Sequence, residues 1–389
     1  MKKIFDSINF WIIAPNLLLL LIALLFNVAV SYRDNQVFAH KSFERLSNQI
    51  SQEVNRQINS YLADALLLNK LNENSISLEQ LNFDSSNKEK ANLELEAKNR
   101  ELKETSEKLN LFVSQEFLNV LEIKKTTEIE LGKNVERKMS ILFSDIRSFT
   151  NLSTNMSPKD NFDFINAYLK RMEPAILENN GFIDKYIGDA IMALFDGTKS
   201  GLNSIEAALS MLTRLKEYNN KRISEDRSPI DIGIGIHTGD LMLGMIGGDN
   251  RIDGTVISSD VNLASRLEGL TKYFGASLIV SEKTLLHVGE NKRKNYDYRY
   301  LGPVTPKGTR DAVRIYEIFN NDESNLKSSK IENKEKFEEA LALSLKMEHE
   351  KSREIFESIQ QKCSQDKAVE YFIKACQEKK DFGKEFGAK

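Results

Sequence analysis

Cysteine is nearly absent from this 389-residue sequence, which has only Cys363 and Cys376. Two thiols at this spacing fit no metal motif and cannot form a disulfide framework, so both are expected to be reduced. A net charge of one sign is also lacking, because 54 basic residues face 57 acidic ones. The composition therefore does not indicate nucleic acid as a partner. The length predicts two to three domains of about 150 residues.

Long apolar runs are scarce, and the one that could cross a bilayer lies at the N-terminus. Between Asp6 and Arg33 no residue is charged, and the run is long enough to span the hydrocarbon core. Residues 1–33 are therefore predicted to be a membrane anchor. A signal peptide is the alternative, since residues 17–26 alone would fit its shorter apolar core. No later run could span, so the chain after Arg33 is expected on one side of the membrane.

The segment after the anchor predicts helices and a coiled coil. Residues 34–87 are typical of an amphipathic helix that runs into a polar loop. In residues 88–118, leucines recur every seven residues: Leu95, Leu102 and Leu109. Polar residues fill the other seam position, which indicates a parallel dimeric coiled coil acting as a signalling linker. A single solvated helix is the alternative. Residues 119–137 are predicted to be a neck.

Residues 138–320 have a globular composition in which helices alternate with antiparallel hairpins. This order predicts an α+β fold with helices packed on a sheet. Helices are expected at 158–177, 202–222 and 261–274, single strands at 139–146, 277–281, 298–308 and 313–319, and hairpins at 181–195 and 231–247.

Two carboxylates are expected to meet at one end of this sheet. Asp145 ends the first strand and Asp189 lies in the turn of the first hairpin. Carboxylates with room for water and substrate phosphates suit Mg²⁺ or Mn²⁺. Taken singly, Asp145 could be a helix N-cap and Asp189 an ordinary turn residue. Arg147 could neutralise Asp145 in a surface ion pair.

A second polar cluster lies on the helix at 261–274. Asn262 and Arg266 are one turn apart and share a face. An amide beside a guanidinium can hold a ribose and a phosphate, because arginine offers a rigid fork of donors to phosphoryl oxygens. An exposed polar helix face is the alternative for these two residues alone.

Taken together and in order, these segments resemble the class III adenylate/guanylate cyclases, in their bacterial, membrane-anchored, adenylate-type form. The resemblance covers roughly residues 137–320 and rests on five successive motifs: FSDIRSFT, GFIDKYIGDAIMALF, GIGIHTGDLMLGMIG, DGTVISSDVNLASRLEGLTKYFG and PKGTRDAVRIYEI. It implies a ferredoxin-like catalytic domain that acts as a dimer. The implied reaction makes a 3′,5′-cyclic nucleotide and pyrophosphate from a nucleoside triphosphate.

The resemblance also implies a role for each site residue. Two divalent ions, Mg²⁺ or Mn²⁺, would be held by Asp145, Asp189 and the backbone carbonyl of Ile146. Such ions would lower the pKa of the ribose 3′-hydroxyl and steady the triphosphate. The resemblance implies that Arg266 stabilises the transition state and that Asn262 orients the ribose. It implies that Arg251 and Lys307 contact the β- and γ-phosphates.

Base choice depends on Lys185 and Thr255, which match the positions that select the purine in the resembled family. The ammonium of Lys185 only donates, so it suits an acceptor such as adenine N1, whereas guanine would require a carboxylate there. Thr255 is the residue common in bacterial cyclases and could serve either base. The sequence therefore predicts ATP as substrate. A surface lysine paired with Asp184 is the alternative for Lys185.

Lys185 and Asp189 lie on one hairpin yet would address opposite ends of a nucleotide. The resemblance implies a head-to-tail homodimer in which one subunit supplies the metal aspartates. The partner supplies Lys185, Thr255, Asn262 and Arg266, which gives two symmetric sites.

Two stretches depart from or mimic known motifs. Where the family usually has I-G-D-x-V-N, this chain has ISSDVN, so Ser258 and Ser259 replace the glycine and the first acid. Activity is still expected, but the turn geometry and dimer contacts can differ. The GGDNR stretch at Gly247 is similar to a diguanylate cyclase signature without its defining last residues, and a hairpin turn is expected there.

Residues 321–389 are expected to be a polar linker followed by two amphipathic helices. These resemble one tetratricopeptide hairpin, with Ala340, Phe356, Asp366, Tyr371 and Ala375 at the motif positions. One repeat is rarely stable alone, so it is expected to pack on the cyclase domain or on its dimer mate.

ATP is cytosolic, so the catalytic domain is expected in the cytoplasm and the single span in the cell (inner) membrane. The N-terminus would then lie outside, which Lys2 and Lys3 do not favour. Sensors of this kind commonly carry a second span and an extracytoplasmic domain, so a missing segment is a further alternative. A guanylate cyclase and a catalytically silent nucleotide-binding receptor are the competing functions.

Overall fold

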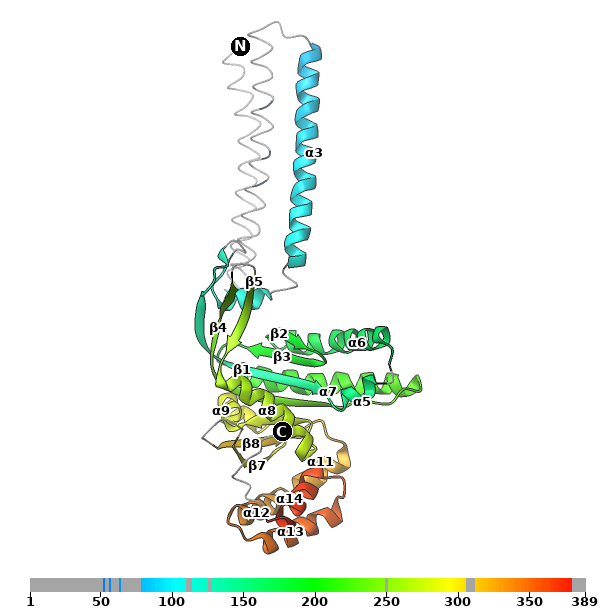
Figure 1. Cartoon of the computed structure of the whole chain (residues 1–389), viewed down its shortest axis with the longest axis vertical. Coiled ribbons are helices and arrows are strands. Elements are labelled where there is room, and N and C mark those ends of the chain that lie inside the picture. Colours follow the sequence, from blue (N-terminus) through cyan, green and yellow to red (C-terminus); the bar gives the residue numbers. More distant parts are fainter. Residues whose placement is uncertain are drawn as a thin grey trace, which may run out of the picture. The chain divides into compact units, whose positions relative to one another are not determined.

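The computed structural model describes residues 78–109, 114–124, 128–154, 156–248, 251–305 and 312–379, together with Gln52, Arg56 and Ala63 (Figure 1). The chain divides into two compact units, residues 1–104 and 105–389. The predicted membrane anchor lies outside the described residues. Within the described ranges, no helix is both long and apolar enough to cross a bilayer.

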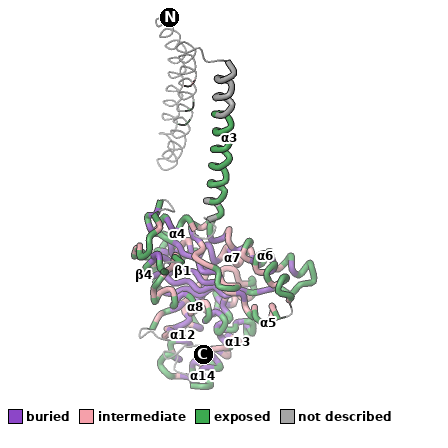
Figure 2. Tube along the Cα trace, turned by 45° about the horizontal axis from the view of Figure 1, so that its top comes forward, coloured by how far each residue is buried: buried purple, intermediate pink, exposed green. Residues whose placement is uncertain are grey.

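Helix α3 (Leu78–Leu109) contains residues 88–109 of the predicted coiled-coil segment and begins ten residues earlier than expected, inside the predicted polar loop. Residues 115–118 of that segment belong to a separate short helix. Leu95 and Leu102 are each 60% exposed. Figure 2 shows the coloured part of α3 as exposed. The described part of the chain therefore leaves this leucine row open to solvent.

The first half of the cyclase-like region has a β-α-β-β-α-β order. Its main elements are β1 (Asn134–Ile146), α6 (Pro158–Leu177), β2 (Gly181–Ile187), β3 (Ala190–Phe195), α7 (Ser200–Ser224) and β4 (Ile232–Gly248). The short helix α5 (Phe149–Ser153) lies between β1 and α6. These strands pair antiparallel in the order β2-β3-β1-β4, which is the ferredoxin-like arrangement. The predicted fold class is confirmed for this core.

Strand β4 corrects one sequence prediction. Residues 231–247 do not form a hairpin; β4 is one continuous strand, and its hairpin partner is β5 (Arg251–Ile257). Glycines alternate with isoleucines in the first half of this strand, so Ile232, Ile234 and Ile236 all face the main core. A Cβ on Gly235 would lie 2.1 Å from the backbone nitrogen of Glu268, so only glycine lets helix α8 (Ser259–Phe274) pack this closely.

The second half extends the sheet beyond β4 in the order β4-β6-β8-β7. Strand β6 runs parallel to β4 and the others are antiparallel, so the sheet is mixed. The elements are β6 (Leu278–Ser281), α9 (Glu282–Val288), α10 (Glu290–Arg293), β7 (Tyr298–Val304) and β8 (Val313–Ile318). Helix α4 (Gln115–Val120) packs near the other end of the sheet, where the ring of Phe117 lies against Gly254.

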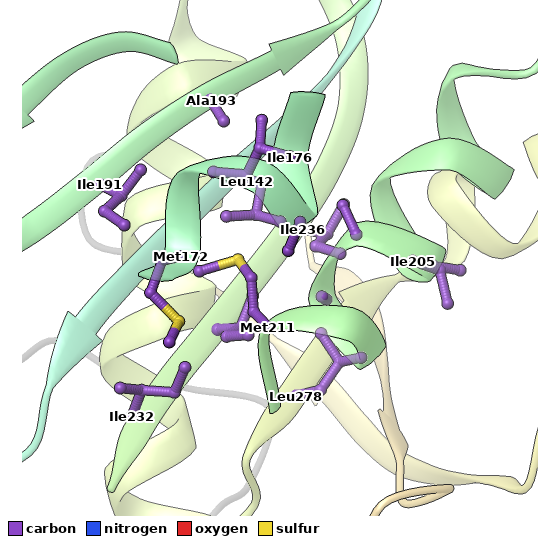
Figure 3. Close-up of a cluster of buried hydrophobic side chains, with 14 of the residues drawn as sticks. Leu142, Met172, Ile176, Ile191, Ala193, Ile205, Met211, Ile232, Ile236 and Leu278 are labelled. Carbon is purple, nitrogen blue, oxygen red and sulfur yellow. The ribbon is translucent and has the colours of Figure 1, made fainter. Parts of the chain in front are cut away.

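The main core fills the space between one sheet face and helices α6 and α7 (Figure 3). Strand β1 is buried on both faces: Leu142 points into this core, while its neighbours Ile141 and Phe143 belong to a second cluster on the opposite face. This explains the continuous apolar run that leads to Asp145. A strand buried on both sides holds the residue at its end in a fixed position.

Four helices follow the sheet: α11 (Ser324–Glu332), α12 (Lys334–Leu345), α13 (His349–Lys362) and α14 (Lys367–Gln377). The segment predicted to be a polar linker thus contains helix α11. Phe337, Phe356 and Phe372 pack together at the centre of the other three helices.

A buried ion network joins these helices to the cyclase sheet. The guanidinium of Arg299 on β7 donates to both carboxylate oxygens of Asp366, at 2.6 and 2.8 Å, and to Glu317 on β8 at 2.7 Å. Lys330 on α11 donates to the same Glu317 at 2.6 Å. The prediction that the C-terminal helices pack on the cyclase domain is confirmed.

Candidate active site

Asp145 and Asp189 are brought together by the pairing of β1 with β3. Ser144 lies opposite Ile191, so the last residues of β1 face the β2–β3 turn that carries Asp189. Gly188 in this turn has φ of +65°, a left-handed conformation that glycine adopts without strain. The sheet therefore places the two carboxylates at one edge.

The electrostatics of the pair are those of two acids sharing a partly buried site. Burial, a hydrogen bond with Asp189 and repulsion from Asp189 together raise the pKa of Asp145 to about 7. Within the part of the chain that the structure describes, Asp189 Oδ2 is buried and has no hydrogen-bond partner. A buried carboxylate oxygen without a partner is costly, and a bound cation would satisfy it.

The structural alternatives for these residues can be compared with the geometry. Asp145 Oδ1 accepts a hydrogen bond from the Ile146 amide at 3.0 Å, but Ser148 and not Asp145 is the N-cap of α5. Arg147 does not pair with Asp145; its Nη2 donates to the carbonyls of Thr271 at 3.2 Å and Ala276 at 2.6 Å. The Asp145 carboxylate is therefore left available for a ligand.

A third carboxylate, Glu268 on α8, lies near this pair and was not predicted from the sequence. Burial, followed by repulsion from Asp145, raises its pKa to about 7, with a further contribution from Asp189. A Cβ on Gly233 would lie 2.8 Å from Glu268 Oε1, and Gly233 pairs with Asp145 across the sheet. No local signal in the sequence marks Glu268, because its burial depends on the packing of α8 against β4.

The donor set fits a hard divalent cation. Among the described residues, no group of three or more His, Cys, Asp or Glu side chains is arranged to hold a metal. Two carboxylates with a neighbouring backbone carbonyl, from Ile146, match Mg²⁺ or Mn²⁺, which keep several positions for water and substrate phosphates. The unpartnered oxygen of Asp189 is the structural observation that favours such an ion.

Lys185 and Thr255, the two predicted base-reading residues, are brought together although 70 residues separate them. Lys185 Nζ donates to Thr255 Oγ1 at 3.5 Å and lies 3.3 Å from Asp184 Oδ2. The side chain of Asp184 is only 2% exposed, and burial raises its pKa while Lys185 lowers it. The predicted pair and the alternative ion pair thus coexist, and together they orient the ammonium.

Asn262 and Arg266 lie on one face of α8, as their spacing predicted, with Asn262 exposed and Arg266 half-buried. In the described part of the chain neither side chain has a hydrogen bond or ion pair. Arg266 is two residues from Glu268, and residues two apart on a helix point in nearly opposite directions. Because Glu268 points toward Asp145, the Arg266 side chain points away from the aspartate pair of its own chain.

The unusual ISSDVN stretch anchors α8 to β4. Ser258 is the N-cap of α8, and its Oγ accepts from the Asp260 amide. Asp260 Oδ2 accepts from the Asp240 amide at 3.0 Å, and Asp260 Oδ1 lies 3.2 Å from Nε2 of His237, a buried side chain. A Cβ on Gly239 would lie 1.9 Å from Asp260 Oδ2, so glycine is required there. The displaced acid therefore fixes the start of the helix that carries Asn262.

The two predicted phosphate contacts are less well placed. Arg251 begins β5, is highly exposed, and forms a 2.8 Å ion pair with Asp253. Lys307 lies outside the described residues. The expected hairpin turn at GGDNR is present, since Gly248 pairs with Arg251, although residues 249–250 are also outside the described residues.

Comparisons with known proteins agree with this geometry. Residues 131–320 match the family model of the adenylate and guanylate cyclase catalytic domain. An adenylate cyclase of Anabaena cylindrica is 40% identical over 222 residues, which cover 56% of this chain and 44% of that protein. The terminal-differentiation-specific adenylate cyclase of Dictyostelium discoideum is 30% identical over 269 residues, covering 69% of this chain and 13% of that protein.

A solved structure of a bacterial light-regulated adenylyl cyclase is similar to this chain in its fold, and this likeness supports only the fold. Its TM-score is 0.51 at 21% identity, over 65% of this chain and 68% of that chain. The chain covers less than half the length of the two curated relatives named above. Residues 131–320 belong to the class III adenylate/guanylate cyclase catalytic-domain family.

Proposed function

We propose that this chain is an adenylate cyclase that converts ATP to 3′,5′-cyclic AMP and pyrophosphate. The observation that carries the proposal is the Asp145–Asp189 pair, with its raised pKa at Asp145 and its buried, unpartnered oxygen at Asp189. Such a pair is unfavourable in an apo protein and becomes favourable when it holds cations against a triphosphate.

Asp145, Asp189 and the carbonyl of Ile146 would hold two divalent ions, Mg²⁺ or Mn²⁺. When bound, these ions activate the ribose 3′-hydroxyl for in-line attack on the α-phosphorus and neutralise the triphosphate. Arg266 donates to the charge that develops on the phosphoryl oxygens. Asn262, one turn away on α8, orients the ribose.

The site is shared across a homodimer. Arg266 points away from the aspartates of its own chain, so a second chain must supply the arginine for each Asp145–Asp189 pair. Large apolar side chains are exposed on the β2–β3 and β4–β5 hairpins and suit burial against a second copy: Tyr186, Ile187, Met242, Ile246, Ile252 and Ile257. The open leucine row on α3 suits a parallel coiled coil between the same two chains.

ATP is the proposed substrate because Lys185 presents a donor to the base. Asp184 and Thr255 both lie beside the ammonium of Lys185 and orient it. The Thr255 hydroxyl can accept from adenine N6 but can also donate to guanine O6. A guanylate cyclase is therefore the second candidate, and base choice depends on Lys185.

A single span in residues 1–33 would anchor the enzyme in the cell (inner) membrane, with the catalytic domain in the cytoplasm where ATP is available. The proposal rests on the charge-free N-terminal run. Alkaline carbonate extraction of membranes tests it: an anchored chain stays with the membrane pellet.

The function is tested by incubating the full chain with Mn²⁺ and either ATP or GTP, and by separating the products. The expected result is cyclic AMP and pyrophosphate from ATP, with little product from GTP. An Asp145→Ala variant should bind nucleotide poorly and release no pyrophosphate. Cyclic GMP as the main product would identify a guanylate cyclase, and nucleotide binding without pyrophosphate release would identify a silent receptor.

A further inference from the structure

A cavity of about 300 Å³ lies where the end of β1, the end of α8 and the start of α14 meet. Its lining includes Arg147, Asp231, Lys272, Gly275, Ser277 and Lys367. These residues come from segments that are up to 220 positions apart in the sequence. The cavity thus exists only because the C-terminal helices pack on the cyclase domain.

Three basic side chains converge on this cavity. Arg147 lies two residues after Asp145, Lys272 lies in the last turn of α8, and Lys367 is the first residue of α14. Gly275 permits the approach of α14, since a Cβ there would lie 2.4 Å from Lys367 Cβ. Gly275 also has φ of +61°, so a larger residue would be strained as well as crowded.

The two lysines of this cavity have no carboxylate partner among the described residues, whereas Arg147 lies near Asp231 and Glu268. Among the described residues, Lys272 and Lys367 form no ion pair or side-chain hydrogen bond, and Arg147 uses only Nη2, for two backbone carbonyls. Burial lowers the pKa of Arg147, while Asp231 and then Glu268 raise it. Asp231 is the only acid among the described residues of the lining, whose side chains together carry two net positive charges.

Two serine hydroxyl groups complete the donor set. Ser277 and Ser148 add hydroxyl groups to the lining. Donors that converge from several directions on an unfilled cavity suit a tetrahedral anion, which accepts hydrogen bonds on every side. The volume is about ten times the share of one water molecule in the liquid, enough for one or two phosphoryl groups with solvent.

We propose that this basic cavity is a binding site for a small phosphate anion, such as phosphate or pyrophosphate, separate from the aspartate pair. Binding here needs neither a divalent cation nor a nucleotide, because the ligands are the side chains of Arg147, Lys272 and Lys367. This distinguishes the cavity from the catalytic site, whose carboxylates repel anions unless a cation is bound.

Occupancy of the cavity would connect two parts of the fold. Arg147 is adjacent to Ile146, and its backbone amide donates to the carbonyl of Asp231 at 2.8 Å. Lys367 is adjacent to Asp366, which the buried Arg299 holds. A bound anion therefore bridges the residues that follow Asp145 at the end of β1 and the C-terminal helices.

The test is calorimetric titration of the full chain with pyrophosphate in EDTA at low ionic strength, where screening is weak. Lys272→Ala and Lys367→Ala should each weaken binding about threefold to tenfold, and the double variant should weaken it further. Lys374→Ala is the matched control, because Lys374 is an exposed lysine on the same helix α14. That control should bind as tightly as the parent.

Two further experiments distinguish this cavity from the catalytic site and show which kind of anion it binds. Asp189→Asn, which alters the metal pair, should leave metal-free pyrophosphate binding intact. Inorganic phosphate and metal-free ATP are titrated in parallel: lysine-dependent binding of phosphate indicates a free anion, and that of ATP alone indicates a nucleotide tail. The proposal is overturned if pyrophosphate does not bind at millimolar concentration, or if the double lysine variant, shown by circular dichroism to be folded, binds as tightly as the parent.

Discussion

Replacing Asp189 by asparagine should make the metal-free protein more stable while it abolishes activity. The two carboxylates repel each other at neutral pH, and burial prevents water from screening that repulsion. Asparagine has nearly the same size as aspartate, so the β2–β3 turn should be retained. Its amide can also donate to the Asp145 carboxylate, which replaces a repulsive contact with an attractive one.

The magnitude follows from the pKa of Asp145, which rises from 3.8 to about 7. A shift of about 3 units would correspond to roughly 4 kcal/mol in a fully buried group. Desolvation is the largest cause and remains in the variant, and Asp145 is partly exposed, so solvent screening reduces the remainder. The expected gain from Asp189→Asn is therefore about 1–2 kcal/mol.

The sign of the pH dependence is fixed by linkage. Because the folded pKa of Asp145 is raised, its contribution to stability is present below about pH 4 and is lost as pH rises toward 7. At pH 5 Asp145 is protonated in the folded parent, so the substitution should have little effect on the free energy of unfolding. At pH 8 Asp145 is ionised, and the full gain should be measured.

The assay is urea unfolding of parent and variant in EDTA at pH 5 and pH 8, repeated with Mn²⁺. Unfolding should be monitored by circular dichroism and not by tryptophan fluorescence, because the single tryptophan, Trp11, lies outside the catalytic unit. Mn²⁺ should stabilise the parent more than the variant, since an ion that binds only the folded state adds stability by mass action. Asp163→Asn, at an exposed acid on α6, should change nothing. A variant that is less stable than the parent at pH 8 in EDTA would refute the mutual repulsion of the pair.

Three other substitutions test the surroundings of the site. Asp260→Asn should weaken the attachment of α8 to β4 and lower kcat about tenfold with little change in KM, because the ribose and phosphate contacts are displaced without being removed; steady-state kinetics measures this. Lys185→Glu should shift the ratio of cyclic AMP to cyclic GMP toward the guanine product, because a carboxylate accepts from guanine; an unchanged ratio would contradict the assigned role. Arg299→Met should lower the free energy of unfolding by about 3 kcal/mol or more, because Asp366 loses its buried partner and Glu317 keeps only Lys330; a change below 1 kcal/mol would show that the network does not join the helices to the sheet.

The sequence predicted the core elements because their signals are local. Ser157 and Pro158 mark the start of α6, and in the structure Ser157 caps the helix by accepting from the Asp160 amide. The apolar run before Asp145 indicated a buried strand, and β1 is buried on both faces. The meeting of Asp145 with Asp189 required only that the first strand pair with the first hairpin.

What the sequence did not predict depends on long-range packing. The β4 glycines suggest a turn when read locally, yet Gly235 serves the approach of α8 to a continuous strand. Glu268 looks like an exposed helix residue until α8 is placed on that strand. Helix α11 is mostly polar, and its Lys330 forms a buried ion pair with Glu317, which no local pattern reveals.

The central claim is that two chains share each site, and mixing two inactive variants tests it most directly. Asp145→Ala and Arg266→Ala should each lack activity alone. When they are co-expressed, about half of the dimers contain both variants and each of these has one intact site, so about a quarter of the parent activity should return. Absence of any recovery, in a mixture shown to contain the heterodimer, would contradict the shared site.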